Sequence, residues 1–268
     1  MAALVLAVGA GGAWWWQSGA EPQAEAATDE ILPVPPVPPR IAEGEDYDKC
    51  LDMLNTDPAG ARDFADSWAQ QGGGEPAEHC RSLAEVSLGE PEHGAQMLDA
   101  LAARSQAAPA ARAALYGQAG QAWMMAGKPE NAFASASKAL ELTQDNPDLL
   151  VDRSVAAASL DRFQQAADDL TEALALDPSR QDALVYRAAA WRNLGKLDLA
   201  QDDIDRALAQ DGDNPDALLE RGILRQRRGD PEGARRDWQR AVELSPDSAT
   251  ADLAQQNLAL LEAGPERR

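Results

Sequence analysis

Small apolar residues recur along the chain with a period of 34 residues. Alanines stand at Ala132, Ala166, Ala200 and Ala234, and each is followed seven residues later by a second alanine. Residues seven apart lie on one stripe of a helix, and small side chains on that stripe let a second helix approach closely. The pattern therefore predicts stacked pairs of α-helices.

Other positions of the same period carry the residues that end and begin helices. Residues that break a helix stand between the two helices of each pair, at Gly127, Asp161, Gly195 and Gly229. Pairs in which a capping residue precedes proline close the repeats: Asn146-Pro147, Asp177-Pro178, Asn214-Pro215 and Ser245-Pro246. We expect the first residue of each pair to cap the next helix and the proline to begin its first turn.

Three arginines precede three aspartates by sixteen residues, which places each pair across the turn of one hairpin. The pairs are Arg153 with Asp169, Arg187 with Asp203, and Arg221 with Asp237. Because contacts to a ligand rarely repeat identically, we interpret these residues as ion pairs within each repeat.

Over residues 113–248 the chain resembles the tetratricopeptide repeat family, whose unit is a 34-residue pair of helices. The resemblance implies an all-α fold, a right-handed superhelical solenoid of helix-turn-helix hairpins. Four units are expected, at 113–146, 147–180, 181–214 and 215–248. Residues 45–112 predict two degenerate hairpins before them. Residues 249–268 predict a C-terminal capping helix and tail, with Leu253, Leu258, Leu260 and Leu261 covering the last repeat.

The first 44 residues predict export. Ala2 to Trp16 is uncharged, and Ala24-Glu25-Ala26 matches the small-x-small pattern of signal-peptide cleavage. Residues 1–26 are therefore predicted to be a signal peptide or an N-terminal membrane anchor through residues 2–16, and both alternatives stay open. A start upstream of Met1 would supply the basic residues that normally precede such a run. Residues 27–44 are rich in proline and predict an extended linker. The protein is thus expected in the periplasm or another extracytoplasmic space, free or held at the inner membrane.

Cys50 and Cys80 are the only cysteines, and each falls on the first helix of a degenerate hairpin. In an oxidising compartment this placement predicts a disulfide. A metal site that also uses the two histidines, His79 and His93, is the alternative. It is disfavoured because His79 and Cys80 are adjacent on a helix and point about 100° apart.

The charge of the chain and the motifs that it lacks limit the classes of function that we expect. The chain has 45 acidic and 24 basic residues, a formal net charge of −21, which repels nucleic acid. Arginines crowd the last repeat, and a solvated helix face explains them more simply than an acidic ligand. No Gly-rich phosphate loop, His-Glu-x-x-His motif or nucleophile elbow is present. We expect a scaffold without catalytic activity, cofactor or metal.

The family resemblance implies that the first helix of each hairpin lines a concave groove that binds a segment of another protein. Groove residues by this resemblance are Gln118, Gln121, Met124, Met125, Asp152, Val155, Ser159, Tyr186, Ala189, Arg192, Asn193, Ile223, Gln226 and Arg227. The family's carboxylate clamp for chaperone tails is not expected, because Gly117, Val151 and Leu219 stand where it needs polar residues. The competing hypothesis is an architectural subunit of an envelope assembly or secretion complex that binds through its outer faces or by self-association.

Overall fold

The computed structural model describes residues 40–263, and every regular element among them is an α-helix. The helices are Glu45–Met53 (α1), Pro58–Gln70 (α2), Gly74–Ser87 (α3), Pro91–Arg104 (α4), Pro109–Met125 (α5), Pro129–Leu142 (α6), Pro147–Ser159 (α7), Phe163–Leu176 (α8), Gln181–Asn193 (α9), Leu197–Gln210 (α10), Pro215–Arg227 (α11), Pro231–Leu244 (α12) and Ala249–Ala263 (α13). The predicted signal peptide or anchor, most of the linker and the tail at 264–268 lie outside this part of the chain. None of the described helices is long and apolar enough to cross a membrane.

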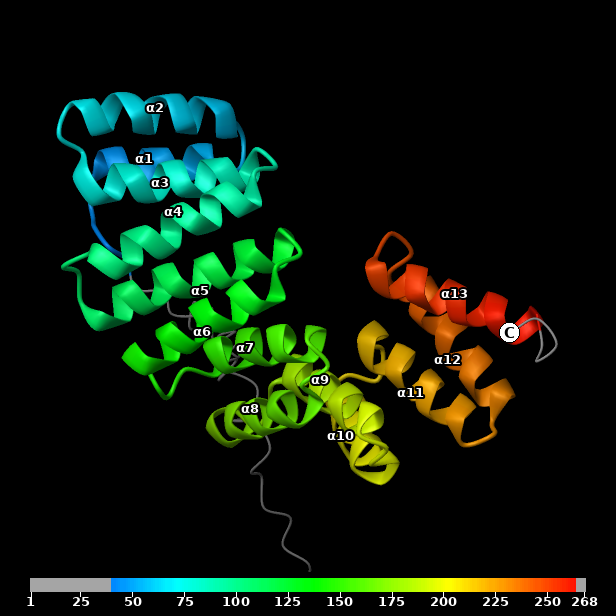
Figure 1. The fold of residues 1–268 in the computed structure, drawn as a ribbon. Helices are drawn as coiled ribbons and strands as arrows, with labels where there is room; N and C mark the ends of the chain where they lie inside the picture. The colour runs from blue at the N-terminus through cyan, green and yellow to red at the C-terminus, as the bar shows by residue number, and fades with distance from the viewer. Residues whose placement is uncertain (1–39, 264–268) are drawn as a thin grey trace, which may run out of the picture. The chain divides into compact units, whose positions relative to one another are not determined.

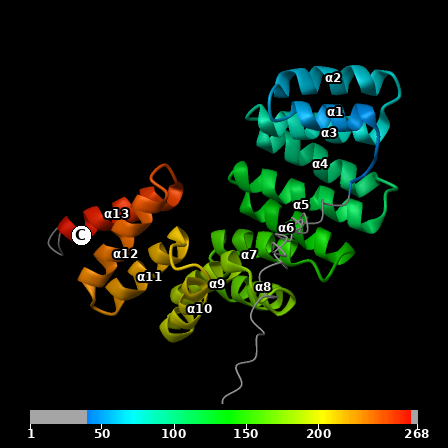
Figure 2. The same ribbon diagram turned by 180° about the vertical axis from the view of Figure 1, so that it is seen from behind.

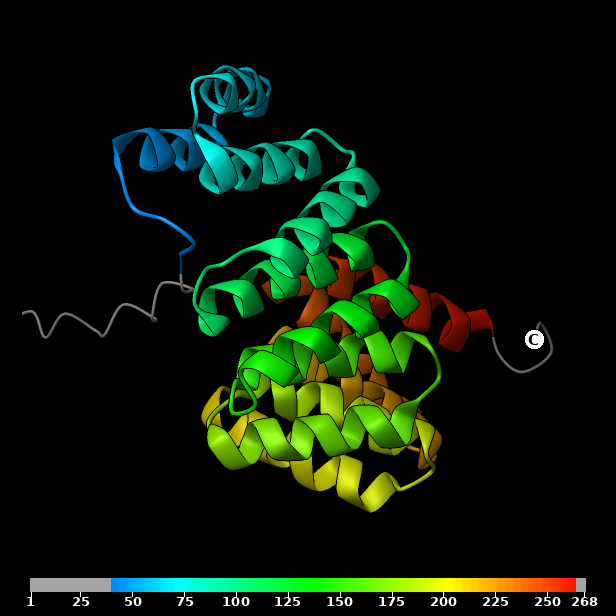
Figure 3. The ribbon, with the colours of Figure 1, turned by 60° about the vertical axis from the view of Figure 1, so that its left-hand side comes forward.

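Consecutive helices pair into hairpins, and the hairpins follow one another in chain order from α1 and α2 to α11 and α12 (Figures 1 and 2). The change of colour along the stack in Figure 3 shows the same succession from another side. The final helix, α13, packs on α12 and α11. The expected all-α, right-handed superhelical solenoid of hairpins with a capping helix is confirmed.

The turn inside each of the four clear hairpins uses one residue in the left-handed region. These residues are Gly127, Asp161, Gly195 and Gly229, with φ between 58° and 83°. Asp161 is the single residue other than glycine with positive φ in the described part of the chain. Its short polar side chain tolerates this conformation better than most side chains. The repeat therefore preserves the turn geometry even where the glycine is replaced.

In the last repeat, Gly222 of α11 lies directly against the side chain of Trp238 of α12. A Cβ atom at Gly222 would lie 2.3 Å from Nε1 of Trp238, so no larger residue fits without movement. Trp238 is fully buried, and its Nε1 donates to the carbonyl oxygen of Leu219 at 3.1 Å. The indole ring of Trp238 therefore requires a glycine at this position of α11.

Two of the four predicted helix starts are wrong. Asn146 and Asn214 accept hydrogen bonds from the first backbone N–H groups of α7 and α11, as expected. Asp177 instead accepts from the backbone and hydroxyl of Ser179 in a tight turn, and α9 begins only at Gln181. Likewise α13 begins at Ala249, and its cap is Ser248 rather than Ser245. Pro178 and Pro246 therefore lie in the turns before these helices.

The three predicted ion pairs are present. Each arginine donates through two nitrogens to both carboxylate oxygens of its aspartate, at 2.6–3.0 Å. The aspartates are buried: Asp169, Asp203 and Asp237. Bidentate pairs of this kind link the two helices of a hairpin. Loss of the arginine would leave a buried carboxylate without a partner, which is strongly destabilising.

The ends of the solenoid differ from the expectation in detail. Helix α5 begins at Pro109, four residues before the expected start of the first clear unit. Leu258 and Leu261 of α13 pack against the core of the last repeat as predicted. Leu253 and Leu260, however, are about half exposed, so the prediction that all four leucines cover the last repeat is wrong. Ala251 and Ala254 occupy the buried positions instead, because close helix packing favours the smaller side chains.

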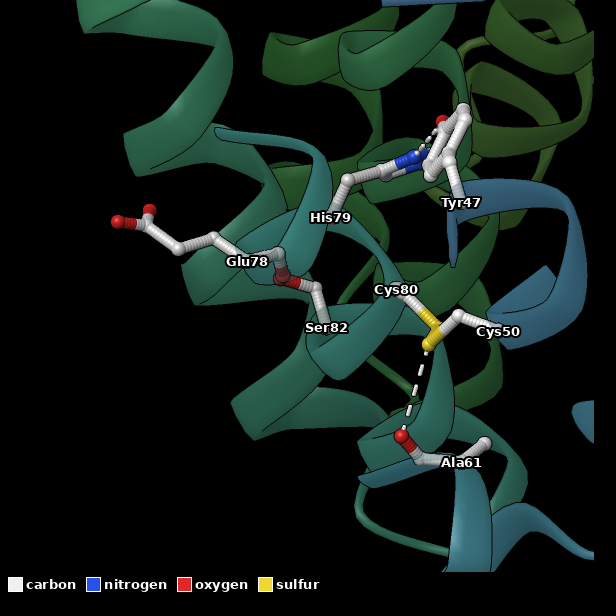
Figure 4. The surroundings of a disulfide bond; sticks show 7 residues. All are labelled: Tyr47, Cys50, Ala61, Glu78, His79, Cys80 and Ser82. Carbon is white, nitrogen blue, oxygen red and sulfur yellow. Dashed lines mark hydrogen bonds between the residues drawn. A yellow bond between two sulfur atoms is a disulfide. The ribbon is translucent and has the colours of Figure 1, made fainter. Parts of the chain in front are cut away.

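A disulfide joins Cys50 of α1 to Cys80 of α3, the pairing predicted from the sequence (Figure 4). The two cysteines and Ala65 form a small buried cluster, with Leu54 and Phe64 packed against it. This cluster is separate from the main apolar core, which begins at α4. A covalent link thus stabilises the part of the solenoid that has the smallest apolar core.

His79 of α3 lies beside the disulfide, and its ring meets Tyr47 of α1 (Figure 4). Burial raises the pKa of Tyr47 to about 12, so this phenol keeps its proton and donates to Nδ1 of His79 at 2.5 Å. The Nε2–H of His79 then donates to Oε1 of Gln118 at 2.7 Å. Burial also lowers the pKa of His79, which favours the neutral ring that this arrangement requires. The side chain connects three successive hairpins.

Candidate partner-binding surface

The first helices of the four clear hairpins, α5, α7, α9 and α11, contact one another in order. We call the exposed side chains of these four helices the first-helix face. All of the predicted groove residues belong to these four helices. The predicted groove residues therefore come from four separate segments of the chain. A long bound segment of a partner would contact all four helices.

Several predicted groove residues are engaged within the fold. Gln118 holds His79, and Met124 packs against the main apolar core. Ile223 packs against the core of the last repeat. Arg192 pairs with the buried carboxylate of Glu220 on α11. The structure thus gives these four side chains a structural contact whatever they do for a partner.

Other predicted groove residues are exposed to solvent or half-buried. Met125 is 66% exposed and Tyr186 is 44% exposed, the largest open apolar surfaces on this face. Asn193 is exposed and donates to the carbonyl oxygen of its own helix at Ala189. Arg227 is exposed and donates to the carbonyl oxygen of Arg192 at 3.3 Å. Val155 and Gln226 are half-buried between these positions.

Three aspartates stand at equivalent positions near the starts of three successive first helices. Asp148, Asp182 and Asp216 are each the second residue of α7, α9 and α11, and we call them the acidic row. Carboxylates in the first turn also interact favourably with the helix dipole. None of the three is in the predicted groove list, although their spacing of 34 residues is visible in the sequence.

Arg180 lies between the first two members of the acidic row. Its Nη1 donates to Asp148 at 2.5 Å, and its Nε and Nη2 donate to Asp182 at 3.1 and 2.7 Å. The side chain is 18% exposed, and the hydrogen bonds to Asp182 are the main reason why its pKa is raised. Nothing in the sequence pattern singled this residue out, because the equivalent positions in the neighbouring repeats are Asn146 and Asn214.

Asp152 and Tyr186 lie one turn further along α7 and α9. Burial is the main cause that raises the pKa of Asp152 to about 6, and Asp148 and Asp182 add to it although Gln121 donates to its carboxylate at 3.1 Å. Burial also raises the pKa of Tyr186, and the carboxylates of Asp216, Asp182 and Asp152 raise it further. The carboxylates of Asp152, Asp182 and Asp216 therefore act on the hydroxyl of Tyr186, and Arg180 offsets part of their effect.

The arginines of the last repeat are mostly paired. Arg225 donates to Asp237, Arg228 to Asp198, and Arg240 to Asp213. These contacts favour the interpretation of a solvated helix face over that of an anion-binding patch. Residues 40–263 contain no group of three or more His, Cys, Asp or Glu side chains placed to hold a metal ion.

Comparisons with known proteins agree with this architecture. Residues 151–215, 192–249 and 219–261 match the family model described as tetratricopeptide repeat. Among curated proteins no match is found.

Solved structures share the fold. The structure of the APC/C hetero-tetramer Cut9–Hcn1 has a TM-score of 0.61 at 18% identity, over 80% of this chain and 42% of that chain. PilF of Pseudomonas aeruginosa has a TM-score of 0.60 at 15% identity, over 79% of this chain and 95% of its own. YrrB has a TM-score of 0.50 at 21% identity, over 79% of this chain and 98% of its own. This chain thus spans less than half of the Cut9–Hcn1 chain that it matches.

The 34-residue period, the geometry of the hairpins and the similarity to solved structures agree with one another. The family model matches the last three of the four clear repeats and the helix that follows them, and the structural similarity covers about four fifths of this chain. This chain belongs to the tetratricopeptide repeat family.

Proposed function

We propose that this protein is a non-enzymatic scaffold that binds a segment of another protein along its first-helix face. The observation that carries the proposal is Tyr186, whose ring is 44% exposed in the middle of that face on α9. Exposed aromatic residues flanked by apolar and charged side chains are typical centres of protein interfaces. Here Val155 and Ala189 supply the half-buried apolar surroundings, and the acidic row supplies charge.

The family offers a precedent. YrrB, which shares the fold, is described as a tetratricopeptide repeat protein with an unusual peptide-binding site. An extended segment of a partner would fit the present chain, because the four first helices expose side chains at regular intervals.

The cell envelope is the proposed location, with the protein exported and either released or tethered through residues 2–16. Two features support this part of the proposal. The uncharged N-terminal run and the following proline-rich linker suit a leader or anchor and a spacer. The Cys50–Cys80 disulfide suits an oxidising compartment, since disulfides are rare in the reducing cytosol. A fusion of alkaline phosphatase after residue 44 would be active on export and inactive if the chain stays in the cytosol.

The binding surface is tested by comparing two exposed apolar residues with equal exposure. Tyr186 lies on the first-helix face, and Leu176 lies on the second helix α8; each is 44% exposed. Replacing each by a photo-crosslinking amino acid in intact cells, followed by mass spectrometry, identifies what lies against either face. We expect a specific partner segment from position 186 and none from position 176.

The matched substitutions complete the test. Tyr186→Ala should weaken capture of that partner by about tenfold or more, the loss typical of a hot-spot residue, and Leu176→Ala should not. Both variants should melt as the unmodified protein does, because both side chains are half exposed. Loss of capture in Leu176→Ala alone would move binding to the outer faces and support an architectural subunit instead.

A further inference from the structure

Two leucines of α13, Leu253 and Leu260, are 50% and 48% exposed. They are seven residues apart, so they lie on one stripe of the helix, which we call the α13 stripe. Helix α13 packs on α12 and α11 at the end of the stack of hairpins (Figure 1). The 34-residue period gives each leucine an equivalent position in every clear repeat, and the contacts of those positions show what such a stripe binds.

The position of Leu253 is covered by the next first helix in the earlier repeats. Its equivalents are Gly117, Val151, Val185 and Leu219. A Cβ atom at Gly117 would lie 2.8 Å from Cδ2 of Leu149 on α7, so this position of α5 faces the following first helix. The two valines are only 6% and 7% exposed, and the leucine of α11 packs against the cluster that contains Ala254 of α13. The position is half exposed in α13, where the described chain has no further first helix.

The position of Leu260 also faces the next first helix. Its equivalent in α9 is Arg192, whose guanidinium pairs with Glu220 of α11. Its equivalent in α7 is Ala158, which packs against a cluster that contains Ala190 of α9. Both leucines of the α13 stripe therefore occupy positions that bind a following first helix inside the stack.

We propose that the α13 stripe binds a helix of another protein, which stacks on α13 as each first helix stacks on the one before it. The interface that repeats within the chain would then continue into the partner. This surface is separate from the first-helix face, and the inference does not depend on the proposed function.

The contacts inside the stack indicate which side chains the bound helix carries. By the period, the positions of Val185 and Arg192 face those of Ala217 and Glu220, which are three residues apart. Leu260 replaces the arginine, so a carboxylate opposite it would be buried without a partner. The bound helix therefore has apolar residues at positions i and i+3.

The charge of the chain favours a different protein over a second copy. Helix α1, the first helix at the other end of the stack, has three acidic residues in its first turn, Glu45, Asp46 and Asp48. Helix α13 carries the exposed Asp252 in its own first turn. These two ends repel each other, and so do two chains with a net charge of −21 each. A helix with basic residues beside its apolar positions complements Asp252.

Photo-crosslinking in intact cells tests the α13 stripe with the full chain. A photo-crosslinking amino acid replaces Leu260, or Leu199 of α10 as the control, which is 46% exposed. From position 260 we expect one crosslinked segment that has apolar residues at i and i+3 with basic residues beside them, and we expect none from position 199. Absence of a segment with this pattern would overturn the proposal.

The captured segment is then made as a synthetic peptide and titrated into the purified full chain. Leu253→Gln and Leu260→Gln should each weaken binding by about fivefold or more, because each removes an apolar contact. Leu199→Gln should bind within about twofold of the unmodified chain. All three variants should melt as the unmodified chain does, since the replaced side chains are half exposed. Unchanged binding in both α13 variants, or an equal loss in Leu199→Gln, would overturn the site.

Two further measurements separate the proposed occupant from the alternatives. Tyr186→Ala should leave binding of the peptide unchanged; a loss in this variant with none in Leu260→Gln would assign the segment to the first-helix face and overturn the α13 site. Sedimentation equilibrium of the chain alone should show a monomer. A dimer that disappears in Leu260→Gln would show that a second copy covers the α13 stripe, which would overturn the proposal of a different protein.

Discussion

Arg192 of α9 and Glu220 of α11 form an ion pair at the boundary between the third and fourth clear repeats, and the side chains are only 15% and 7% exposed. One repeat earlier, the same two positions hold Ala158 and Tyr186. A buried charge pair thus stands where the preceding repeat has an alanine and an exposed tyrosine. The guanidinium that the sequence places in the groove is bonded within the fold.

Arg192→Ala should therefore destabilise the protein, by about 3–5 kcal/mol, because it leaves the carboxylate of Glu220 buried without its partner. Urea unfolding measures this loss. Arg236→Ala is the control, since Arg236 is an exposed arginine on α12 and its loss should be nearly neutral. The double variant Arg192→Leu with Glu220→Leu should be more stable than Arg192→Ala. Equal stability of Arg192→Ala and the unmodified protein would show that the pair contributes nothing.

Reduction of the Cys50–Cys80 disulfide should loosen residues 45–104 and leave residues 113–248 folded. The link closes a loop with a sequence separation of 30 residues. In the chain-entropy model, a loop of that size stabilises the native state by about 3–4 kcal/mol. Hydrogen exchange with and without reductant measures the effect segment by segment. Labelling of thiols in the denatured protein without reductant would contradict the prediction, because both cysteines would then be free.

Ala200→Leu should cost about 1–3 kcal/mol or more of unfolding free energy. Ala200 is fully buried on α10 where the two helices of its hairpin meet, so three extra carbon atoms have no space. The neighbouring Leu199 is 46% exposed, and Leu199→Ala serves as a control with little expected effect. Thermal unfolding of the three proteins decides the question, and a melting temperature of Ala200→Leu within error of the unmodified protein would contradict the packing.

His79 should make the protein less stable as the pH falls below 6.5. Its native pKa is lowered from 6.5 by burial, so the unfolded chain takes up a proton first and gains stability relative to the native state. Asp152 acts in the opposite direction. Its native pKa is raised from 3.8 to about 6, so protonation favours the native state between these values.

The two contributions overlap in pH, so the measurement compares variants. We expect the unfolding free energy of His79→Gln to fall less between pH 7 and 5 than that of the unmodified protein. His93→Gln removes the exposed histidine and should keep the original pH dependence. Identical profiles for all three proteins would mean that His79 has the same pKa in the folded and unfolded chain.

Much of the fold can be predicted because its determinants repeat. The alanines, the left-handed turn residues and the pairs such as Arg153 with Asp169 act inside one hairpin, and a contact that recurs from repeat to repeat is visible in the sequence. Helix starts were less predictable. Asp177-Pro178 has the composition of a cap, but the chain makes an additional turn before α9 because Arg180 occupies the N-cap position and bonds Asp148 and Asp182 instead.

By itself, the sequence determined that this protein is a stack of helical hairpins, since the period of small and bulky residues specifies which faces of neighbouring helices must meet. Only the tertiary structure decided which charges are available on the first-helix face. Arg192 meets Glu220, Arg180 meets Asp148, and His79 lies between Tyr47 and Gln118. These contacts join different repeats and occur once each. They depend on how each hairpin is rotated against the next, and that rotation follows from the packing of whole helices rather than from the residues of any one repeat.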